Sequence, residues 1–373
     1  MRLYFPLLLL FCIITVAAHA QKEQAPSINL GDPAPPLRVR KWIKGTPVKR
    51  FEKGHVYVLE FWATWCKGCI AAMPHLSALA REYKDRVTIL SIDIYEKKTT
   101  PLEKVKAFVD SMAHRMDYSV AADDSNFMVA GWIEATGEQD NGIPKTFVVN
   151  AEGRLAWIGD PTELDEVLRK IVDNTWDITE ALSKRNLNKR LEELDKEVNY
   201  TLNTYVGNAF KPGDLGKPDS ALLLINEIVR NEPKLKYAPF IATHTFSSLL
   251  KTEPHKAYEF GKEVLVNPSY NDPPYHLIIG IIKWYSDKLN LPAKIYELGA
   301  EAYQAKIDLI PYPELVNISR LYNNMAEMYW RADNKVKAID AMQKAIETLK
   351  SEKDFSKNDM AVFESRLQQY KNR

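Results

Sequence analysis

Cys66 and Cys69 are the residues whose type and spacing most directly suggest chemistry in this sequence. Two cysteines three positions apart suit half of a zinc site, a structural disulfide or a redox centre. Zinc sites in proteins use four ligands, and the sequence offers neither a second cysteine pair nor two histidines at ligand spacing, so we expect no metal site. A structural disulfide stays open, although so short a loop would constrain the unfolded chain little.

The residues around the pair favour the redox interpretation. Val56–Trp62 has the apolar pattern of a buried strand, and helical periodicity begins at Cys66 after a three-residue turn. A thiolate at a helix N-terminus is stabilised by unpaired N–H groups and the helix dipole, which lowers its pKa. Lys67 adds a positive charge beside it, and Gly68 leaves it approachable by a bulky substrate. Cys69, one turn later, is placed to attack a mixed disulfide formed at Cys66.

The first twenty residues resemble a secretory signal peptide. An apolar run ends on Ala18-His19-Ala20, a pattern that a signal peptidase cuts, here before Gln21. Cleavage would remove Cys12 and leave Cys66 and Cys69 as the only cysteines. We therefore predict a soluble periplasmic protein in an oxidising compartment, with an uncleaved N-terminal membrane anchor as the alternative.

Composition and pattern predict two domains. The chain carries 50 Lys and Arg against 49 Asp and Glu, so no basic field for nucleic acid is expected. Residues 21–36 are proline-rich and predict a linker, and residues 37–175 alternate strand and helix patterns, which indicates an α/β layer fold. The expected strands are Val56–Trp62, Val87–Asp93, Thr146–Asn150 and Leu155–Gly159, and the expected helices are 67–83, Leu102–Arg115 and Glu163–Asp173. The last two strands flank a short turn containing Gly153 and should pair as an antiparallel hairpin, which makes the central sheet mixed.

Residues 178–373 are almost continuously helical in pattern and predict an all-α domain. Leu321–Leu349 resembles a tetratricopeptide repeat, because Ala326, Tyr329, Ala338 and Ala345 lie where small and aromatic residues let two antiparallel helices pack closely. Repeats of this kind present binding surfaces, so a partner of this domain is expected. An irregular helical bundle is the alternative.

At this point two separated motifs carry a family resemblance. "EFWATWCKGC" followed by Met73-Pro74, and then "GIPKTFVVNAEGRLAWIG" at residues 142–159, resemble the thioredoxin-fold thiol–disulfide oxidoreductases. They are most similar to the exported TlpA-like and ResA-like proteins, over about residues 29–175. The resemblance implies a thioredoxin fold and a Cys66–Cys69 disulfide, with Cys66 attacking and Cys69 resolving.

The resemblance also assigns roles around the pair. Trp65 is expected to form part of the exposed surface beside the cysteines. Pro144 matches the cis-proline that faces the cysteines, and this proline leaves the backbone of Ile143 free to pair with a substrate peptide. Glu60 falls where thioredoxins place a buried acid, whose raised pKa would let it shuttle the proton of Cys69.

Two departures limit what the resemblance implies. Lys67-Gly68 differs from the Gly-Pro of thioredoxin and the Pro-His of strong oxidases, so the tuning of the redox potential is particular to this chain. Ala72 replaces a glutamate that some of these reductases carry, so a role in cytochrome c maturation does not carry over.

The function expected is reduction of protein disulfides by an exported enzyme. The sequence has no flavin or nucleotide motif, so no cofactor is expected, and another protein must supply electrons, plausibly a membrane conduit. The alternatives are a redox-sensing adaptor that binds a partner through its helical domain, and a disulfide oxidase or isomerase.

Overall fold

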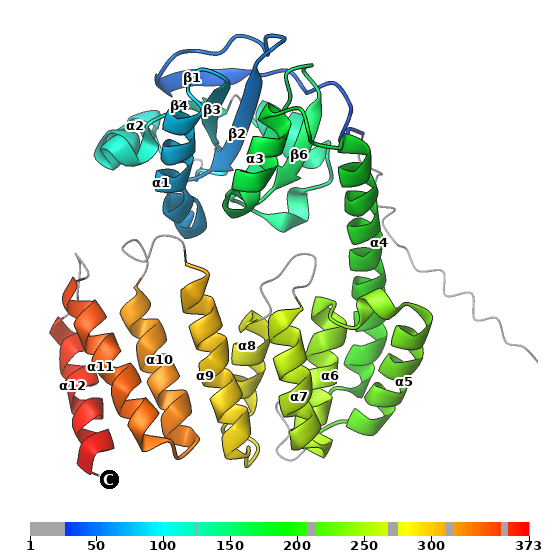
Figure 1. Cartoon of the computed structure of the whole chain (residues 1–373), viewed down its shortest axis with the longest axis vertical. Coiled ribbons are helices and arrows are strands. Elements are labelled where there is room, and N and C mark those ends of the chain that lie inside the picture. Colours follow the sequence, from blue (N-terminus) through cyan, green and yellow to red (C-terminus); the bar gives the residue numbers. More distant parts are fainter. Residues whose placement is uncertain are drawn as a thin grey trace, which may run out of the picture.

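The computed structural model describes residues 27–97, 99–123, 125–207, 214–267, 275–310, 317–351 and 357–372. The predicted signal peptide and the first six residues of the predicted linker lie outside the described residues. Figure 1 shows a sheet-containing part and a helical part, joined by the long helix α4 (Ile178–Leu202).

The first part is built on a mixed six-stranded sheet with the strand order β1-β4-β3-β2-β5-β6. β2 lies parallel to β3 and β3 parallel to β4, whereas β1, β5 and β6 each pair antiparallel with their neighbours. The strands are β1 (Val39–Lys44), β2 (Val56–Trp62), β3 (Val87–Asp93), β4 (Ser119–Asp123), β5 (Lys145–Val149) and β6 (Leu155–Gly159). The predicted α/β fold with a mixed sheet is confirmed.

Two strands escaped the sequence analysis. β1 has the sequence VRKWIK, in which charged residues interrupt the apolar pattern, and β4 has the sequence SVAAD, which is short and built from small residues. Charged edge strands and short strands give weak apolar signals, because they bury little side-chain surface on their own. The two strands pair with each other, and β4 extends the sheet beyond β3.

Three helices cover one face of the sheet, and a π-helical turn together with the start of α4 packs on the other. α1 (Lys67–Glu82), α2 (Leu102–Met112) and α3 (Leu164–Val172) pack on the face that carries Val58 and Trp62. η2 (Val129–Glu134) packs with Tyr57, Leu59 and Phe61 on the opposite face. Alternate residues of β2 therefore enter two separate apolar cores, which explains why the whole strand is buried.

The segment before the sheet differs from the predicted linker. The N–H of Gly31 donates to the Leu155 carbonyl at 2.8 Å, and the N–H of Leu155 donates to the Asp32 carbonyl at 2.9 Å. Leu30 is buried in the second core. Residues 30–34 thus run along β6 and satisfy backbone groups that would otherwise be unpaired at the sheet edge.

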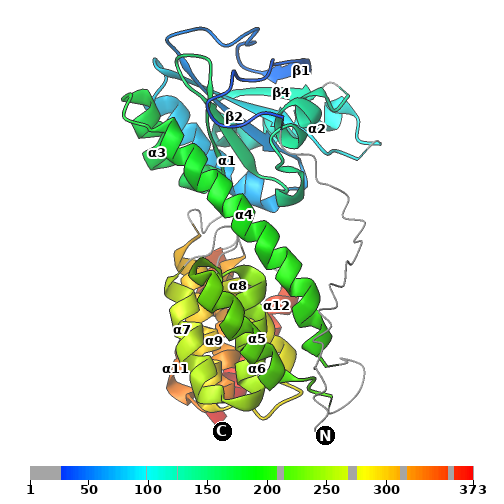
Figure 2. The same ribbon diagram turned by 90° about the vertical axis from the view of Figure 1, so that its right-hand side faces the viewer.

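The second part is largely helical in its described residues, as predicted. Figures 1 and 2 show its helices packed side by side below the sheet-containing part. They are α5 (Pro218–Asn231), α6 (Pro239–Thr252), α7 (Pro254–Val266), α8 (Tyr275–Tyr285), α9 (Ala293–Asp308), α10 (Ile318–Arg331), α11 (Lys335–Ser351) and α12 (Lys357–Asn372). Ala326, Ala338 and Ala345 are fully buried where α10 and α11 meet, while tetratricopeptide character stays a prediction.

Helix α4 belongs to both parts. Ile178, Ala181 and Leu182 pack on the core of the sheet, whereas Leu191 and Leu202 lie in a core shared with α5 and α6. Figure 2 shows this helix crossing from one part to the other. Within the described ranges, no helix is both long and apolar enough to cross a membrane.

Candidate active site

Cys66 and Cys69 form a disulfide at the start of α1. Their sulfurs are 2.10 Å apart, and Cys66 caps the helix by accepting a hydrogen bond from the N–H of Cys69 at 3.1 Å. Cys69 is fully buried and Cys66 nearly so. The sulfur of Cys66 therefore lies among the free N–H groups of a helix N-terminus, where a thiolate would be stabilised.

The loop before β5 faces this disulfide. The Ile143–Pro144 peptide bond is cis, and the carbonyl oxygen of Ile143 lies 3.6 Å from the sulfur of Cys66. A Cβ added at Gly68 would lie 3.2 Å from Cδ of Pro144, so the loop packs closely against the residue between the cysteines. The structure thus brings together four of the residues that the sequence analysis singled out.

The turn before Cys66 is held by a second segment, which the sequence analysis missed. The N–H of Thr64 donates to the carboxylate of Glu96 at 2.6 Å, and the indole N–H of Trp65 donates to the carbonyl of Tyr95 at 3.1 Å. Trp65 keeps 54% of its surface exposed, and Tyr95 is exposed beside it. An aromatic surface therefore borders the disulfide, held in place by the end of β3.

Glu60 lies in β2, on the same face of the sheet as Val58 and Trp62, which pack with both cysteines. Its side chain is fully buried, and neither carboxylate oxygen has a hydrogen-bond partner among the described residues. Burial, with a smaller contribution from Asp160, raises its pKa well above the usual value. A carboxylate in this setting binds a proton more readily than one in water and can exchange it inside the protein.

Lys67 and Asp93 are two further ionisable residues, one at the start of α1 and one at the end of β3. Lys67 is exposed at the first position of α1. Asp93 is buried at the end of β3, and burial, followed by Glu96 and then Asp123, raises its pKa to about 8. Glu96 in turn accepts the hydrogen bond from Thr64, so two coupled acids support the turn that leads into Cys66.

A buried ionic cluster, also missed by the sequence analysis, lies at the base of the Ile143–Pro144 loop. Glu138 pairs with Lys145 at 3.0 Å and with Arg185 of α4 at 2.6 Å. Although burial alone raises its pKa, Lys145 and Arg185 lower the pKa of Glu138 to about 2. The signal in the sequence is weak, because Arg185 lies far along the chain from Glu138 and Lys145 and each residue has the pattern of an ordinary surface charge.

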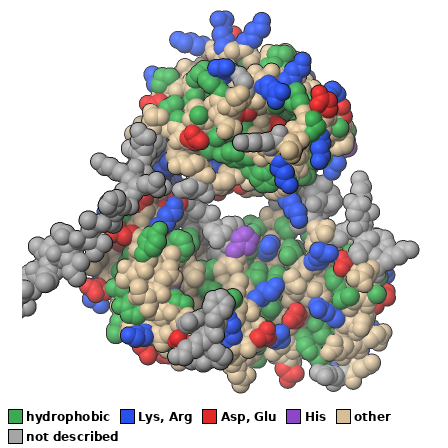
Figure 3. Space-filling view, turned by 180° about the vertical axis from the view of Figure 1, so that it is seen from behind, with side chains coloured by type: hydrophobic (Ala, Val, Ile, Leu, Met, Phe, Trp, Pro, Cys, Tyr) green, Lys and Arg blue, Asp and Glu red, His purple; other side chains and the backbone are tan. Residues whose placement is uncertain are grey.

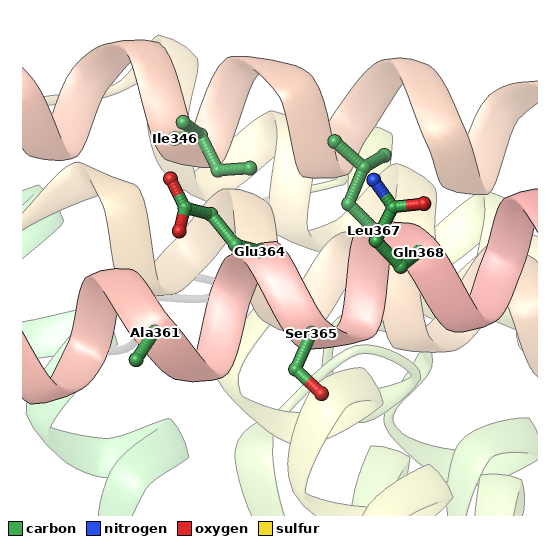
Figure 4. Close-up of a pocket in the computed structure, with 6 residues that line it drawn as sticks. All are labelled: Ile346, Ala361, Glu364, Ser365, Leu367 and Gln368. Atoms are coloured by element: carbon green, nitrogen blue, oxygen red, sulfur yellow. The ribbon is translucent and has the colours of Figure 1, made fainter.

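Two further hollows are seen on the molecule. In the space-filling view of Figure 3, a hollow lies between the sheet-containing part and the helical part. Figure 4 shows a separate surface pocket of about 590 Å³ between α11 and α12, lined by Ile346, Ala361, Glu364, Ser365, Leu367 and Gln368. In the ranges that the structure describes, no three His, Cys, Asp or Glu side chains gather so as to hold a metal ion.

Several known proteins are similar in sequence to this chain. The model of the AhpC/TSA family matches residues 30–158. Protein FixW of Rhizobium leguminosarum is 34% identical over 170 residues, which cover 44% of this chain and 75% of FixW. The thiol:disulfide interchange protein DsbE of Pasteurella multocida is 28% identical, over 41% of this chain and 82% of DsbE. The thiol-disulfide oxidoreductase ResA of Bacillus anthracis is 30% identical, over 32% of this chain and 65% of ResA.

A solved structure of a thiol-disulfide isomerase from Corynebacterium glutamicum also aligns with the chain. It has 17% sequence identity and a TM-score of 0.33, and covers 40% of this chain and 96% of that one. The similarity to FixW extends over three quarters of that protein, and the family model covers the cysteine pair together with the loop that faces it. The predicted resemblance is confirmed: the chain belongs to the thioredoxin-like AhpC/TSA family, among its thiol–disulfide oxidoreductases.

Proposed function

We propose that this protein is an exported enzyme that reduces disulfides in other proteins through a Cys66/Cys69 dithiol–disulfide cycle. The observation that carries the proposal is the disulfide at the N-terminus of α1, with the Ile143 carbonyl 3.6 Å from the sulfur of Cys66. This arrangement supports a nucleophilic sulfur next to a backbone edge that an extended peptide can join.

The reaction follows from the two sulfurs. In the reduced enzyme, the Cys66 thiolate attacks one sulfur of a substrate disulfide, the substrate S–S bond breaks, and its other sulfur leaves as a thiolate. Cys69, once deprotonated, then attacks the sulfur of Cys66. The Cys66–Cys69 bond forms, the second substrate sulfur is released, and two electrons have passed from the enzyme to the substrate.

We assign supporting roles to the residues around the sulfurs. Glu60 is proposed to accept the proton of Cys69, since a buried carboxyl with a raised pKa is suited to proton exchange. Trp65 and the backbone of Ile143 are proposed to bind the substrate peptide, and Pro144 to shape the loop. Lys67 and Gly68 are proposed to tune the redox potential.

After each cycle, another protein must reduce the Cys66–Cys69 disulfide and so return the enzyme to its dithiol form. A thiol donor must attack the Cys66–Cys69 bond, because no redox cofactor motif occurs in the sequence.

The export proposal rests on residues 1–20, and the N-terminus of the protein isolated from its native host tests it. Gln21 as the first residue supports cleavage, whereas an intact leader supports the anchored alternative.

The decisive experiment on the reaction uses two cysteine variants. Cys66→Ser should abolish dithiol-dependent reduction of a protein disulfide, while Cys69→Ser should accumulate mixed disulfides through Cys66 that identify the substrate. Activity that survives Cys66→Ser contradicts the mechanism. A redox titration of the wild-type disulfide then separates a reductase from an oxidase or isomerase.

A further inference from the structure

The cluster around Glu138 holds the segment that ends at the disulfide. One carboxylate oxygen of Glu138 accepts from the Asn141 side-chain amide at 2.8 Å and pairs with Lys145 at 3.0 Å. The other oxygen pairs with Arg185 at 2.6 Å. Glu138 is buried, and both of its carboxylate oxygens are paired. Its contacts with Asn141, Lys145 and Arg185 therefore fix the position of its side chain.

Helix α4 closes the cluster from the other side. Besides its pair with Glu138, Arg185 donates to the Thr136 carbonyl at 2.7 Å. Lys189, one turn later on α4, donates to the carbonyls of Thr136 and Gly137 at 2.7 and 3.2 Å. Both cations of the helix thus bind the backbone directly before Glu138 as well as its side chain.

The same segment leads to Cys66 within a few residues. Glu138 precedes a 3-10 turn at residues 139–141, and Gly142 has a φ of +66°, which lets the chain reverse into Ile143. Lys145, the other cation of the cluster, is the first residue of β5. Ile143 is therefore held between two anchored positions, with its carbonyl beside the sulfur of Cys66.

Helix α4 also carries the first contacts of the helical part. Asp195 accepts hydrogen bonds from the N–H groups of Phe240 and Ile241 at the start of α6, at 2.9 and 3.0 Å. Figure 1 shows α4 as one continuous helix that runs from the sheet-containing part to the helical part. One rigid element therefore connects α6 to the base of the loop that faces the disulfide.

We propose that Glu138 is a positioning residue, through which Arg185 and Lys189 of helix α4 set the place of the Ile143 backbone beside Cys66. The proposal rests on the proposed function, since it concerns how a substrate peptide is received at that backbone. It gives the helical part a role in the exchange reaction, because a displacement of α4 displaces the surface that binds the peptide. The sulfurs themselves are held by α1 and do not depend on the cluster.

The test compares a protein substrate with a small one in the full-length protein. Glu138→Gln leaves the cations of Lys145, Arg185 and Lys189 without their shared anion. We expect the KM for a disulfide-bonded protein to rise about tenfold. A shift of about an ångström in the Ile143 backbone is sufficient to weaken binding of the substrate peptide by this much. The rate with hydroxyethyl disulfide, which reaches Cys66 without the Ile143 backbone, should stay within about twofold.

Hydrogen exchange gives a readout that does not depend on activity. The amides of residues 139–143 should exchange faster in Glu138→Gln than in the wild type. Arg185→Gln, which leaves Glu138 paired with Lys145, should show the same pattern more weakly and serves as the test variant where Glu138→Gln does not fold. Glu166→Gln, which breaks the exposed pair with Lys170 on α3, is the matched control and should change neither readout.

Each outcome decides between the proposals. Equal losses with both substrates, or unchanged exchange at residues 139–143, overturn the positioning role of Glu138. A wild-type protein that reduces neither substrate overturns the proposed function, and the exchange measurement then still decides whether α4 positions the loop.

Discussion

Glu60 is buried on the sheet face beneath the disulfide, and Glu138 is buried where the loop before β5 meets α4. The pKa values of these two glutamates are shifted in opposite directions. Glu60 has no hydrogen-bond partner among the described residues, and burial raises its pKa. Glu138 is just as deeply buried but pairs with two cations, and its pKa falls to about 2. Burial alone therefore does not decide the charge of an acid, since the neighbouring charges do.

The contrast separates two uses of a buried carboxyl. A buried acid without partners has a raised pKa and lowers the stability of the fold, which is the setting in which a group exchanges protons. An acid within a satisfied ion cluster stays charged and fixes the geometry of what surrounds it. The first region is suited to chemistry at Cys69, and the second to holding the loop opposite Cys66.

The largest effect is expected when the ion cluster around Glu138 is broken. Glu138→Gln should lower the free energy of unfolding at pH 7 by about 3 kcal/mol, because removing one partner leaves buried charges uncompensated. The folded pKa of about 2 lies below the ordinary 4.5, so this stability is present above pH 4.5 and is lost as the pH falls toward 2. Urea unfolding at pH 7 and pH 3 measures both. A difference between variant and wild type that does not shrink at pH 3 contradicts the ionic explanation.

A smaller change in the free energy of unfolding, of opposite sign, is expected when Glu60 is replaced. Glu60→Leu should raise the free energy of unfolding at pH 7 by about 1 kcal/mol, because an apolar side chain of similar size replaces an unsatisfied polar group. Since the folded pKa of Glu60 is raised, the wild type loses stability as the pH rises above 4.5 and the gain should grow with pH. Denaturant unfolding between pH 4 and pH 8 measures it, with Glu166→Gln as the control. A variant less stable than the wild type across this range indicates that Glu60 has a favourable partner.

The smallest expected effect concerns a third acid that shares features of both regions. Asp93 is buried like Glu60, but it also interacts with Glu96, and its pKa rises to about 8 from an ordinary 3.8. Its contribution to stability is complete below pH 3.8 and is lost as the pH rises through 8. Asp93→Asn should flatten the fall in melting temperature between pH 4 and pH 8. An unchanged slope assigns the loss of stability in this range to other groups.

The parts of the site that the sequence predicts are those encoded within one short segment. Cys66, Cys69 and Glu60 lie within ten residues of one another, so a strand, a turn and a helix start are sufficient to place them. The sequence predicts the central strands β2 and β3 with the observed ends because both are almost completely buried and mostly apolar. The structure also has the cis peptide at Pro144 that the family motif implies.

The sequence by itself thus determined the α/β fold, the helical second part and the cysteine pair that forms the disulfide, because local apolar periodicity and cysteine spacing carry that information. The tertiary structure alone decided that Glu138 meets Arg185 and Lys189, that residues 30–34 run along β6, and that α4 is shared by both parts. A charged side chain looks the same in the sequence whether it is solvated or buried. Only the folded chain shows which opposite charge it meets, and that partner fixes both its charge state and its role.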